Sequence, residues 1–536
     1  MTRIFVNGLV WPQAHRAAGP EPTALAVCDG HVVACGTDAE IRELAGAGAG
    51  EIDLGGRRLV PGLIDGHMHA VRGGASWARE LRWTDLPDLG AGLAAIRAVA
   101  RRAEPGEWIR VVGGWHPCQF PESREPTRAE LDAVTTEHPV YVQALYEVAV
   151  LNSAALRAAG IDAASADPPG GRFERDPVTG EPTGRVFGMG AFNHVLSAVP
   201  PATPEEERRS TAVMFADLHS LGLTGLVDAG GFGMPPQRYE PLFALWREGG
   251  LSMRMRLFLS AADPGQEYAQ LVDWMRHTPS RFGDPMLAFL GIGEVVHFGC
   301  HDFEGLEEFA ISDAAIDELH RICSHAAERG WPVNIHAVLD ESIDRILTCW
   351  EAVDERIPVR GLRFTLSHGD RISPRNLKRL KALGAGLVLD DHHVFKAALS
   401  ERAWGAGSMA AVPPLADLLA ADVPLAAGTD ATRACSHNPW LALWWLVTGR
   451  SADGTARRAA EHRMSREQAL DCYTAGSAWL SFEETARGRL VPGAYADFAV
   501  LSEDYFAVPE DRIPLIRSEL TVVAGEVVHS TGAVPA

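Results

Sequence analysis

The feature that most constrains this chain is the alternation of short apolar runs with helix-like segments through its second half. The apolar runs predict strands at 226–228, 290–292, 333–336, 364–368, 387–389 and 424–427. Several of the later runs are flanked by segments of helical pattern, such as 313–329 and 374–383. Alternating β and α units of about 30 to 40 residues are typical of a parallel sheet or an eight-stranded barrel. The number of units favours an α/β fold of the (β/α)8 TIM barrel type.

Two parts of the chain lie outside this alternation. Short β-like runs occupy the first 60 residues, with hairpin-type turns at Asn7-Gly8 and Asp29-Gly30, and similar runs return at 498–529. Strands at both termini can satisfy their open edges by pairing, which predicts a small composite β-sandwich domain. The Pro-, Gly- and Glu-rich segment from about 71 to 202 is predicted to be a large insertion after the first barrel strand. The predicted boundaries are therefore 1–60, 61–484 and 485–536.

Composition excludes several classes of partner. The 49 Lys and Arg residues face 70 Asp and Glu residues, and the resulting net charge of -21 would repel phosphate backbones and anionic membrane surfaces. We therefore expect no nucleic acid partner. No apolar run approaches the ~20 residues that cross a bilayer, and the first residues alternate like a strand instead of forming a secretion signal. The 8 cysteines are scattered and form no Cys-x-x-Cys pair, so we expect a cytoplasmic protein.

Polar residues stand where the predicted strands end. His67 and His69 follow the run 59–66, and residues two apart in an extended chain point to the same side, where both can bind one ion. Four more candidates follow or end later runs: Glu294, His336, His368 and Asp430. If the histidine pair ends strand 1, the spacing assigns these four to strands 4, 5, 6 and 8, at the rim where barrel enzymes hold their chemistry. A single strand-end His is more often a scaffold group and a single Asp a helix cap, but the joint set predicts a metal site.

Longer motifs carry a family resemblance. The segments 61–69, 335–337, 367–369 and 428–430 resemble the metal-dependent amidohydrolase superfamily. More narrowly, 113–115, 126–132, 152–156, 168–171 and 474–478 are similar to its YtcJ-like branch, the amidohydrolase-3 group that includes N-substituted formamide deformylases. The resemblance covers nearly the whole chain. It implies a metal-dependent hydrolase of carbon–nitrogen bonds other than peptide bonds, of the amide or N-formyl type.

The resemblance also implies roles for the strand-end residues. His67, His69 and Glu294 would hold a first metal ion. His336 and His368 would hold a second ion or, in a mononuclear site, act as one ligand and one carbonyl-polarising donor. The expected cofactor is Zn2+, as one or two ions, because imidazole-rich sites favour zinc. Asp430 would take a proton from the activated water and pass it to the leaving nitrogen, so Asp430 and His368 are the predicted catalytic residues.

Two residues depart from the pattern of the branch. Its members often have a carboxylated lysine after the fourth strand, where this chain has Glu294, and a carboxylate there can itself ligate or bridge metal ions. A frequent family histidine five residues before the Asn152-Ser153 pair is replaced by Glu147, which indicates a different substrate contact.

The substrate-binding residues are predicted from their place near the expected barrel mouth. They are Trp115, Tyr146, Glu147 and His297. Together with Phe298, Phe303 and Trp404 they indicate a small-molecule substrate with an apolar or aromatic group. His301, His392 and His393 are further candidates. Asp340 is either a group that fixes an imidazole tautomer or an exposed helix carboxylate.

Rival functions remain open from the sequence. The same metal chemistry serves a deaminase or a lactonase, and a catalytically degenerate barrel could bind a ligand without turnover. Relatives of this type are often dimers, which makes a homodimer one option. The apolar patch at 440–446 could be core or interface, and core is the favoured interpretation.

Overall fold

The fold is built on two four-stranded parallel sheets. The structure is a computed structural model that describes residues 2–13 and 20–535. The first sheet has the order β15-β14-β13-β7 and the second β16-β17-β18-β19. The strands are β7 (Leu63–Met68), β13 (Leu223–Asp228), β14 (Arg254–Leu259), β15 (Leu287–Ile292), β16 (Asn334–Ala337), β17 (Thr365–His368), β18 (Gly386–Leu389) and β19 (Leu425–Ala427). The predicted α/β class with parallel sheets is confirmed.

The two sheets meet at both of their outer edges. A parallel bridge joins Ile292, at the end of β15, to Val333 just before β16. On the other side, the Asp430 amide donates to the His67 carbonyl at 2.8 Å and the His69 amide to the Ala431 carbonyl at 2.9 Å. Among the described residues these links do not extend into one continuous ladder of eight strands. The closed barrel therefore stays a prediction.

Helices cover the sheets, and local capping explains where they begin. The helix predicted at 313–329 is α10 (Asp313–Glu328), and that at 374–383 is α12 (Pro374–Ala382). Each is preceded by a serine, Ser312 or Ser373, whose side chain accepts from a backbone amide of the first turn. The apolar patch at 440–446 lies in α15 (Pro439–Thr448) and packs mainly into the core. This agrees with the interpretation of the patch as core. No helix among the described residues is long and apolar enough to span a lipid bilayer.

One strand of the parallel sheets, β14, does not begin as an apolar run, so the sequence pattern does not predict it. Strand β14 begins Arg254-Met255-Arg256, and both arginines are buried. They are accommodated because each forms a two-bond pair with a carboxylate from far along the chain, Arg254 with Asp497 and Arg256 with Glu483. The strand is thus stabilised by partners more than 220 residues away.

The strands of the two termini pair in one sheet. In the order β2-β6-β20-β21-β22, the N-terminal β6 (Arg58–Pro61) runs antiparallel to β20 (Phe498–Leu501), followed by β21 (Ser518–Val523) and β22 (Glu526–Ser530). A second sheet is purely N-terminal, with the order β4 (His31–Gly36), β3 (Ala24–Cys28), β1 and β5 (Gly50–Asp53). The hairpin expected at Asn7-Gly8 is wrong. The chain bends there from β1 (Thr2–Val6) in one sheet to β2 (Leu9–Val10) in the other. The predicted domain boundaries are not tested by this pairing.

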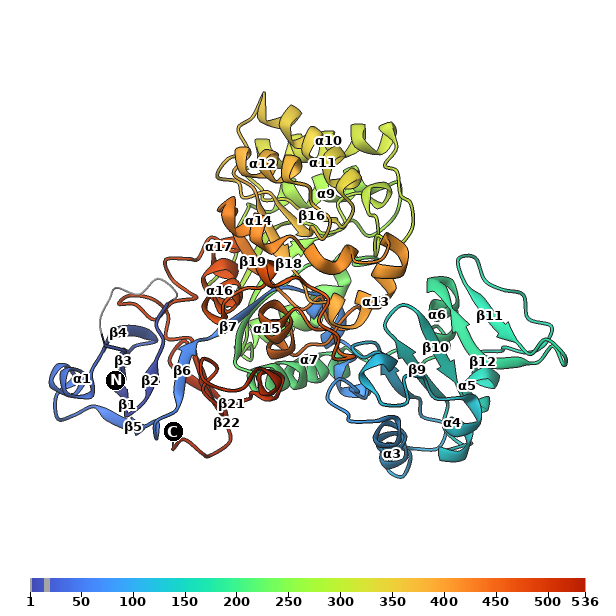
Figure 1. The fold of residues 1–536 in the computed structure, drawn as a ribbon, viewed down its shortest axis with the longest axis horizontal. Coiled ribbons are helices and arrows are strands. Elements are labelled where there is room, and N and C mark those ends of the chain that lie inside the picture. The colour runs from blue at the N-terminus through green and yellow to red at the C-terminus, as the bar shows by residue number, and fades with distance from the viewer. Residues whose placement is uncertain (1, 14–19, 536) are drawn as a thin grey trace.

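A third sheet lies between β7 and β13 in the chain. Its order is β11 (Arg172–Arg175), β12 (Pro182–Phe187), β10 (Val148–Leu151), β9 (Val140–Ala144) and β8 (Ile109–Val112). The accompanying helices are α3 (Leu89–Ala100), α4 (Arg128–Val134), α5 (Ser153–Ala158) and α6 (Gly188–Leu196). Figure 1 shows this sheet and its helices to one side of the parallel sheets, opposite the strands of the N-terminus. It approaches the parallel sheets closely at Gly113, where an added Cβ would lie 2.4 Å from Arg433 Cα. Gly113 also has φ of 71°, which favours glycine. The sheet thus docks on the loop that follows Asp430.

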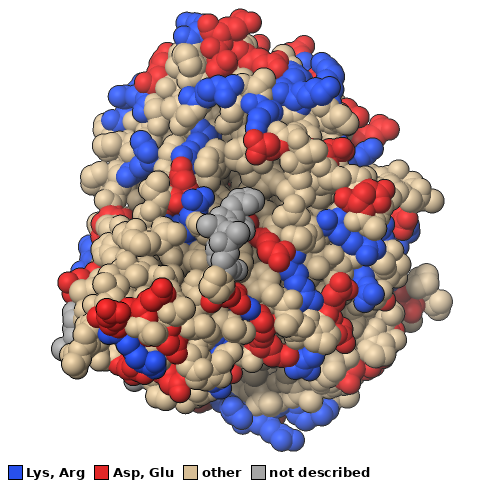
Figure 2. Space-filling view, turned by 60° about the vertical axis from the view of Figure 1, so that its left-hand side comes forward, with Lys and Arg blue, Asp and Glu red and all other residues tan. Residues whose placement is uncertain are grey.

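The surface carries charges of both signs. On the face in Figure 2, acidic and basic side chains of the described residues are interspersed among uncharged ones. The net charge of -21 is therefore not gathered into a single acidic patch on that face.

Asp497→Asn tests the link between β14 and the C-terminal sheet. Both members of the Arg254–Asp497 pair are buried, with 1% and 4% of their side chains exposed. Removing the carboxylate charge leaves buried Arg254 without a counter-charge, so we expect the free energy of unfolding to fall by about 3–5 kcal/mol. The control is Asp85→Asn, because Asp85 pairs with Arg517 at the surface and a loss of ~0–1 kcal/mol is expected. Urea denaturation followed by circular dichroism measures both, and equal losses would refute this role.

Candidate metal centre

The two histidines at the end of β7 point toward one carboxylate from β15 and one from the loop after β19. His69 Nε2 lies 3.3 Å from Glu294 Oε1 and 3.1 Å from Asp430 Oδ1. His67 Nε2 lies 3.3 Å from Glu294 Oε2 and 3.7 Å from Asp430 Oδ1. These four side chains, from three strand ends, enclose one common space.

The second parallel sheet adds two imidazoles to the same carboxylate. His336 Nδ1, from β16, lies 3.5 Å from Glu294 Oε2, and His368 Nε2, from β17, lies 3.6 Å from the same oxygen. The structure therefore brings together all six residues that the strand-end pattern singled out, with Glu294 at the centre. Their roles as ligands stay a prediction.

The free atoms of this cluster fit a metal ion. His67 Nε2, Glu294 Oε2 and His368 Nε2 are buried and make no hydrogen bond. Buried polar atoms without a partner are costly, and a cation among them would satisfy all three. Several sets of atoms lie close enough together to hold an ion, among them His67, His69 and Asp430; His67, Glu294 and His368; and Glu294, His301 and His336. Imidazole nitrogens combined with carboxylate oxygens are typical zinc ligands.

The second nitrogen of each imidazole is held by an acceptor. His69 Nδ1 donates to the Gly230 carbonyl at 2.9 Å, and His336 Nε2 donates to the Phe303 carbonyl at 2.6 Å. Since a carbonyl can only accept, the proton sits on that nitrogen and the other keeps its lone pair toward Glu294. Such hydrogen bonds orient metal-binding imidazoles in proteins.

The same logic applies to the other two imidazoles. His67 Nδ1 lies 3.0 Å from the hydroxyl of Ser367, whose proton goes to Asn334 Oδ1 at 2.8 Å, so His67 Nδ1 is the donor. His368 Nδ1 donates to the Asp390 carboxylate. All four imidazoles thus present a lone pair to the carboxylates.

Electrostatics keep the carboxylates ionised. Burial alone would raise the pKa of Glu294, but positive charge on the neighbouring imidazoles of His67, His336 and His368 holds that pKa well below its usual range. When the imidazoles are neutral and turn lone pairs inward, a bound cation would supply that positive charge instead. Burial also opposes ionisation of Asp430, yet its contacts with His69 and His67 lower its pKa. Two ionised carboxylates in a buried site suit a divalent cation.

Comparisons with known proteins agree with this geometry. The model of the Amidohydrolase family matches residues 50–529. The chain belongs to the amidohydrolase family. The resemblance inferred from the motifs is confirmed, and with it the prediction that the chain is an enzyme of this class.

Individual relatives cover most of the chain. It is 26% identical to YtcJ of Bacillus subtilis over 99% of both chains. It is also 26% identical to N-substituted formamide deformylase of Arthrobacter pascens over 90% of both. Among solved structures, an uncharacterized metal-dependent hydrolase from Pyrococcus horikoshii has a TM-score of 0.67 at 21% identity, over 95% of this chain and 99% of that one. This last likeness shows that the fold is shared.

Two side chains that contact this amidohydrolase centre have weak or no sequence signals. Asp302 Oδ1 lies 3.2 Å from His336 Nε2, and the Asp302 carboxylate also accepts from the amides of Val338 and Leu339. Asp302 follows no strand, so no pattern marks it. Asp390, the partner of His368, directly follows β18. The strand-end rule that found Asp430 would also have found Asp390.

One of the predicted substrate contacts is corrected by its environment. Trp115 is fully buried against Trp83, with ring centroids 4.7 Å apart, and its indole donates to the Gln143 carbonyl. It therefore packs the core of the third sheet. His297 accepts from the Gly299 amide and lies near Glu318 on α10. Its contact with a substrate stays a prediction.

The other two predicted substrate contacts, Tyr146 and Glu147, lie in a loop of the third sheet near Lys396. Tyr146 and Glu147 join β9 (Val140–Ala144) to β10 (Val148–Leu151). Lys396 Nζ lies 5.8 Å from the centre of the Tyr146 ring, and Glu147 is 3.2 Å from His116 Nε2. Glu147 is 32% exposed. Their contact with a substrate stays a prediction.

Asp340 does not hold a ligand imidazole. It accepts from the Ser373 amide at 2.7 Å and from the Asn376 side chain at 2.9 Å, which ties α11 (Asp340–Asp354) to α12. The interpretation as a group that fixes an imidazole tautomer is therefore wrong.

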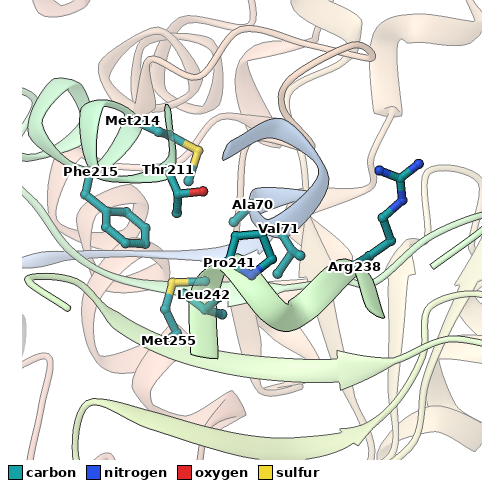
Figure 3. Close-up of a pocket in the computed structure, with 9 residues that line it drawn as sticks. All are labelled: Ala70, Val71, Thr211, Met214, Phe215, Arg238, Pro241, Leu242 and Met255. Carbon is teal, nitrogen blue, oxygen red and sulfur yellow. The ribbon is translucent and has the colours of Figure 1, made fainter. Parts of the chain in front are cut away.

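A separate cavity lies beside the helix that follows His69. Figure 3 shows it between α2 (Ala70–Gly74), α7 (Pro204–His219) and α8 (Glu240–Arg247), with Met214, Phe215, Leu242 and Met255 among its walls. Its volume is about 10 Å³, room for roughly one water molecule. Arg238 is the single ionisable side chain among its described lining residues, so this cavity does not offer the groups that hydrolysis needs.

Asp302→Asn tests whether the contacts behind the imidazoles matter for metal binding. The amide can still accept from the Val338 amide, but it cannot supply the negative charge beside His336. We expect a 10–100-fold weaker metal affinity, as is typical for partners of ligand histidines. Competition with a metallochromic chelator measures the affinity. Asp340→Asn is the matched control and should leave it unchanged, and equal affinities in both variants would refute the role of Asp302.

Proposed function

We propose that the protein is a metal-dependent hydrolase that cleaves a non-peptide carbon–nitrogen bond, of the amide or N-formyl type, in a small molecule. The observation that carries this proposal is the convergence of four imidazoles and two carboxylates at the carboxyl ends of the parallel strands. We further propose that the two sheets act as one (β/α)8 barrel, which the Ile292–Val333 bridge and the amide of Asp430 on His67 support.

The ligands we propose are His67, His69, Glu294, His336 and His368, and the metal is zinc. Five ligands with Asp430 close by exceed the four that one tetrahedral zinc takes, which supports a site that would hold two ions. When bound, such ions lower the pKa of a water molecule toward ~7 and polarise a carbonyl group.

Asp430 is proposed to be the proton carrier. Its Oδ1 is 3.1 Å from His69 Nε2, and its lowered pKa keeps it ionised and able to accept a proton. Once protonated, it would donate to the leaving nitrogen, which otherwise departs as an unstable anion. Asp430 and His368 have φ of 49° and 74°. Such backbone conformations are uncommon for residues other than glycine and cluster at active sites, which supports a role for both.

Aromatic side chains beside His336 support a substrate with an apolar or aromatic group. His301 stacks on His336 with ring centroids 3.7 Å apart, and Phe232 lies 4.6 Å from His301. Phe303 stacks parallel to Phe232 and is 58% exposed. An exposed ring next to a buried polar centre offers apolar area to a ligand. The Arthrobacter relative, named for N-substituted formamides, supports the same class of substrate.

Asp430→Asn tests the reaction. The amide cannot accept the proton, so we expect kcat/KM to fall by about 10²–10⁴ on the best substrate of a panel of N-substituted formamides and amides. Amine and carboxylate release are measured together with zinc content. Asp313→Asn, on the surface of α10, is the control and should match the unsubstituted enzyme. If both the unsubstituted enzyme and Asp430→Asn, loaded with metal, release nothing from the panel, the proposed function is wrong. Release of ammonia alone would identify a deaminase.

Phe303→Ala tests the aromatic contact. We expect KM for N-benzylformamide to rise about tenfold, which corresponds to ~1.4 kcal/mol of lost apolar contact, with little change for N-methylformamide. The control is Phe282→Ala, because Phe282 is equally exposed at 58% but precedes β15 at the opposite end of the sheet. A similar rise in both variants, or in neither, would contradict a substrate role for Phe303.

A further inference from the structure

A second group of metal-ligating side chains lies behind His368 and is not used by the proposed reaction. It consists of Asp370, two residues after β17, and His392 and His393, which follow β18 and begin α13 (His393–Trp404). All three are buried, with at most 3% of each residue exposed.

The three side chains have the spacing of ligands around one ion. His392 Nε2 and His393 Nε2 are 3.0 Å apart. Asp370 Oδ2 lies 3.3 Å from His392 Nε2, and Asp370 Oδ1 lies 3.2 Å from His393 Nε2. Bonds of about 2.0 Å to tetrahedral zinc place neighbouring ligand atoms about 3.3 Å apart. The two imidazole nitrogens and the two carboxylate oxygens are thus spaced closely enough for one ligand atom from each residue to reach a common ion.

The hydrogen bond between the two Nε2 atoms does not satisfy the carboxylate of this group. Asp370 Oδ2 is buried and makes no hydrogen bond. His392 Nδ1 donates to the Asp390 carboxylate, so its Nε2 carries a lone pair that faces the Nε2 of His393. His393 Nδ1 lies 3.3 Å from the Ser400 hydroxyl. Both rings are thus held from behind with Nε2 turned inward, as in histidines that bind metal.

We propose that Asp370, His392 and His393 form a separate zinc site with an open fourth position for a water molecule. Two imidazoles and one carboxylate are ligands that zinc prefers. A small cavity of about 10 Å³, room for roughly one water molecule, borders His393, with Ser451, Arg457 and Arg458 also on its walls. The inference stands independently of the proposed function.

One carboxylate connects the two centres. Asp390 accepts from His392 Nδ1 on one oxygen and from His368 Nδ1 on the other. An ion on His392 draws electron density from that ring and strengthens its hydrogen bond to Asp390, which fixes the carboxylate that orients His368. The second site would therefore act as a positioning element for the reaction centre.

Zinc-soaked crystals of the full-length chain test the proposal directly. An anomalous difference map at the zinc edge is expected to show a peak among Asp370, His392 and His393, resolved from any density at Glu294. In His67→Asn/His69→Asn, the same peak should remain while density at Glu294 is lost. A map with no peak among these three residues would overturn the proposal. It would indicate that Asp370, His392 and His393 are held together by hydrogen bonds without a metal ion.

Zinc stoichiometry provides the second measurement. Relative to the unsubstituted chain, Asp370→Asn and His393→Asn should each bind one zinc ion fewer after dialysis, by elemental analysis. The matched control is His277→Asn, because His277 is 76% exposed and pairs only with Asp273, and it should keep the full zinc content. Full zinc content in folded Asp370→Asn and His393→Asn would overturn the proposal. The map of the unsubstituted chain decides the question if those variants fail to fold.

Discussion

The buried carboxylate of Glu294 is the group on which the rest of the site depends. It is 5% exposed, and its two oxygens lie within 3.6 Å of ring nitrogens from four histidines. An ionised carboxylate in such surroundings is stable only if positive charge or hydrogen-bond donors compensate its lost hydration. Strand ends from both parallel sheets provide those partners. Folding of the two sheets against each other and assembly of the site are therefore one event.

The imidazoles are held in place from outside by groups on other elements. Backbone carbonyls at Gly230 and Phe303 hold His69 and His336, while Ser367 and Asp390 hold His67 and His368. Each ring is thus fixed by a neighbouring strand end or loop, so its orientation depends on the register of the sheets. A small shift between strands would turn lone pairs away from Glu294, which explains why the site requires a rigid scaffold.

The sequence predicts those strands and site residues whose position is determined by a pattern of neighbouring residues. Apolar runs that end in a polar residue identified β16, β17 and Asp430 because burial and strand ends leave a mark in neighbouring residues. The same reasoning misses β14, whose Arg254 and Arg256 are buried by carboxylates beyond residue 480. It also misplaces Trp115, since aromatic rings serve cores and binding sites alike. Long-range pairing leaves no local signal.

The position of Glu294 has a structural requirement in the backbone. A glutamate side chain is short, so the chain after β15 must come close to the imidazoles for the Glu294 carboxylate to lie among them. Gly293 permits that approach. An added Cβ there would lie 2.3 Å from the Asn334 carbonyl, and φ is 149°. The amide of Glu294 then donates to the Ala229 carbonyl at 2.6 Å, which anchors the short side chain between β13 and β16. Gly293 and Glu294 therefore act as a pair, because the Glu294 carboxylate lies among the imidazoles only where the backbone at Gly293 can come this close.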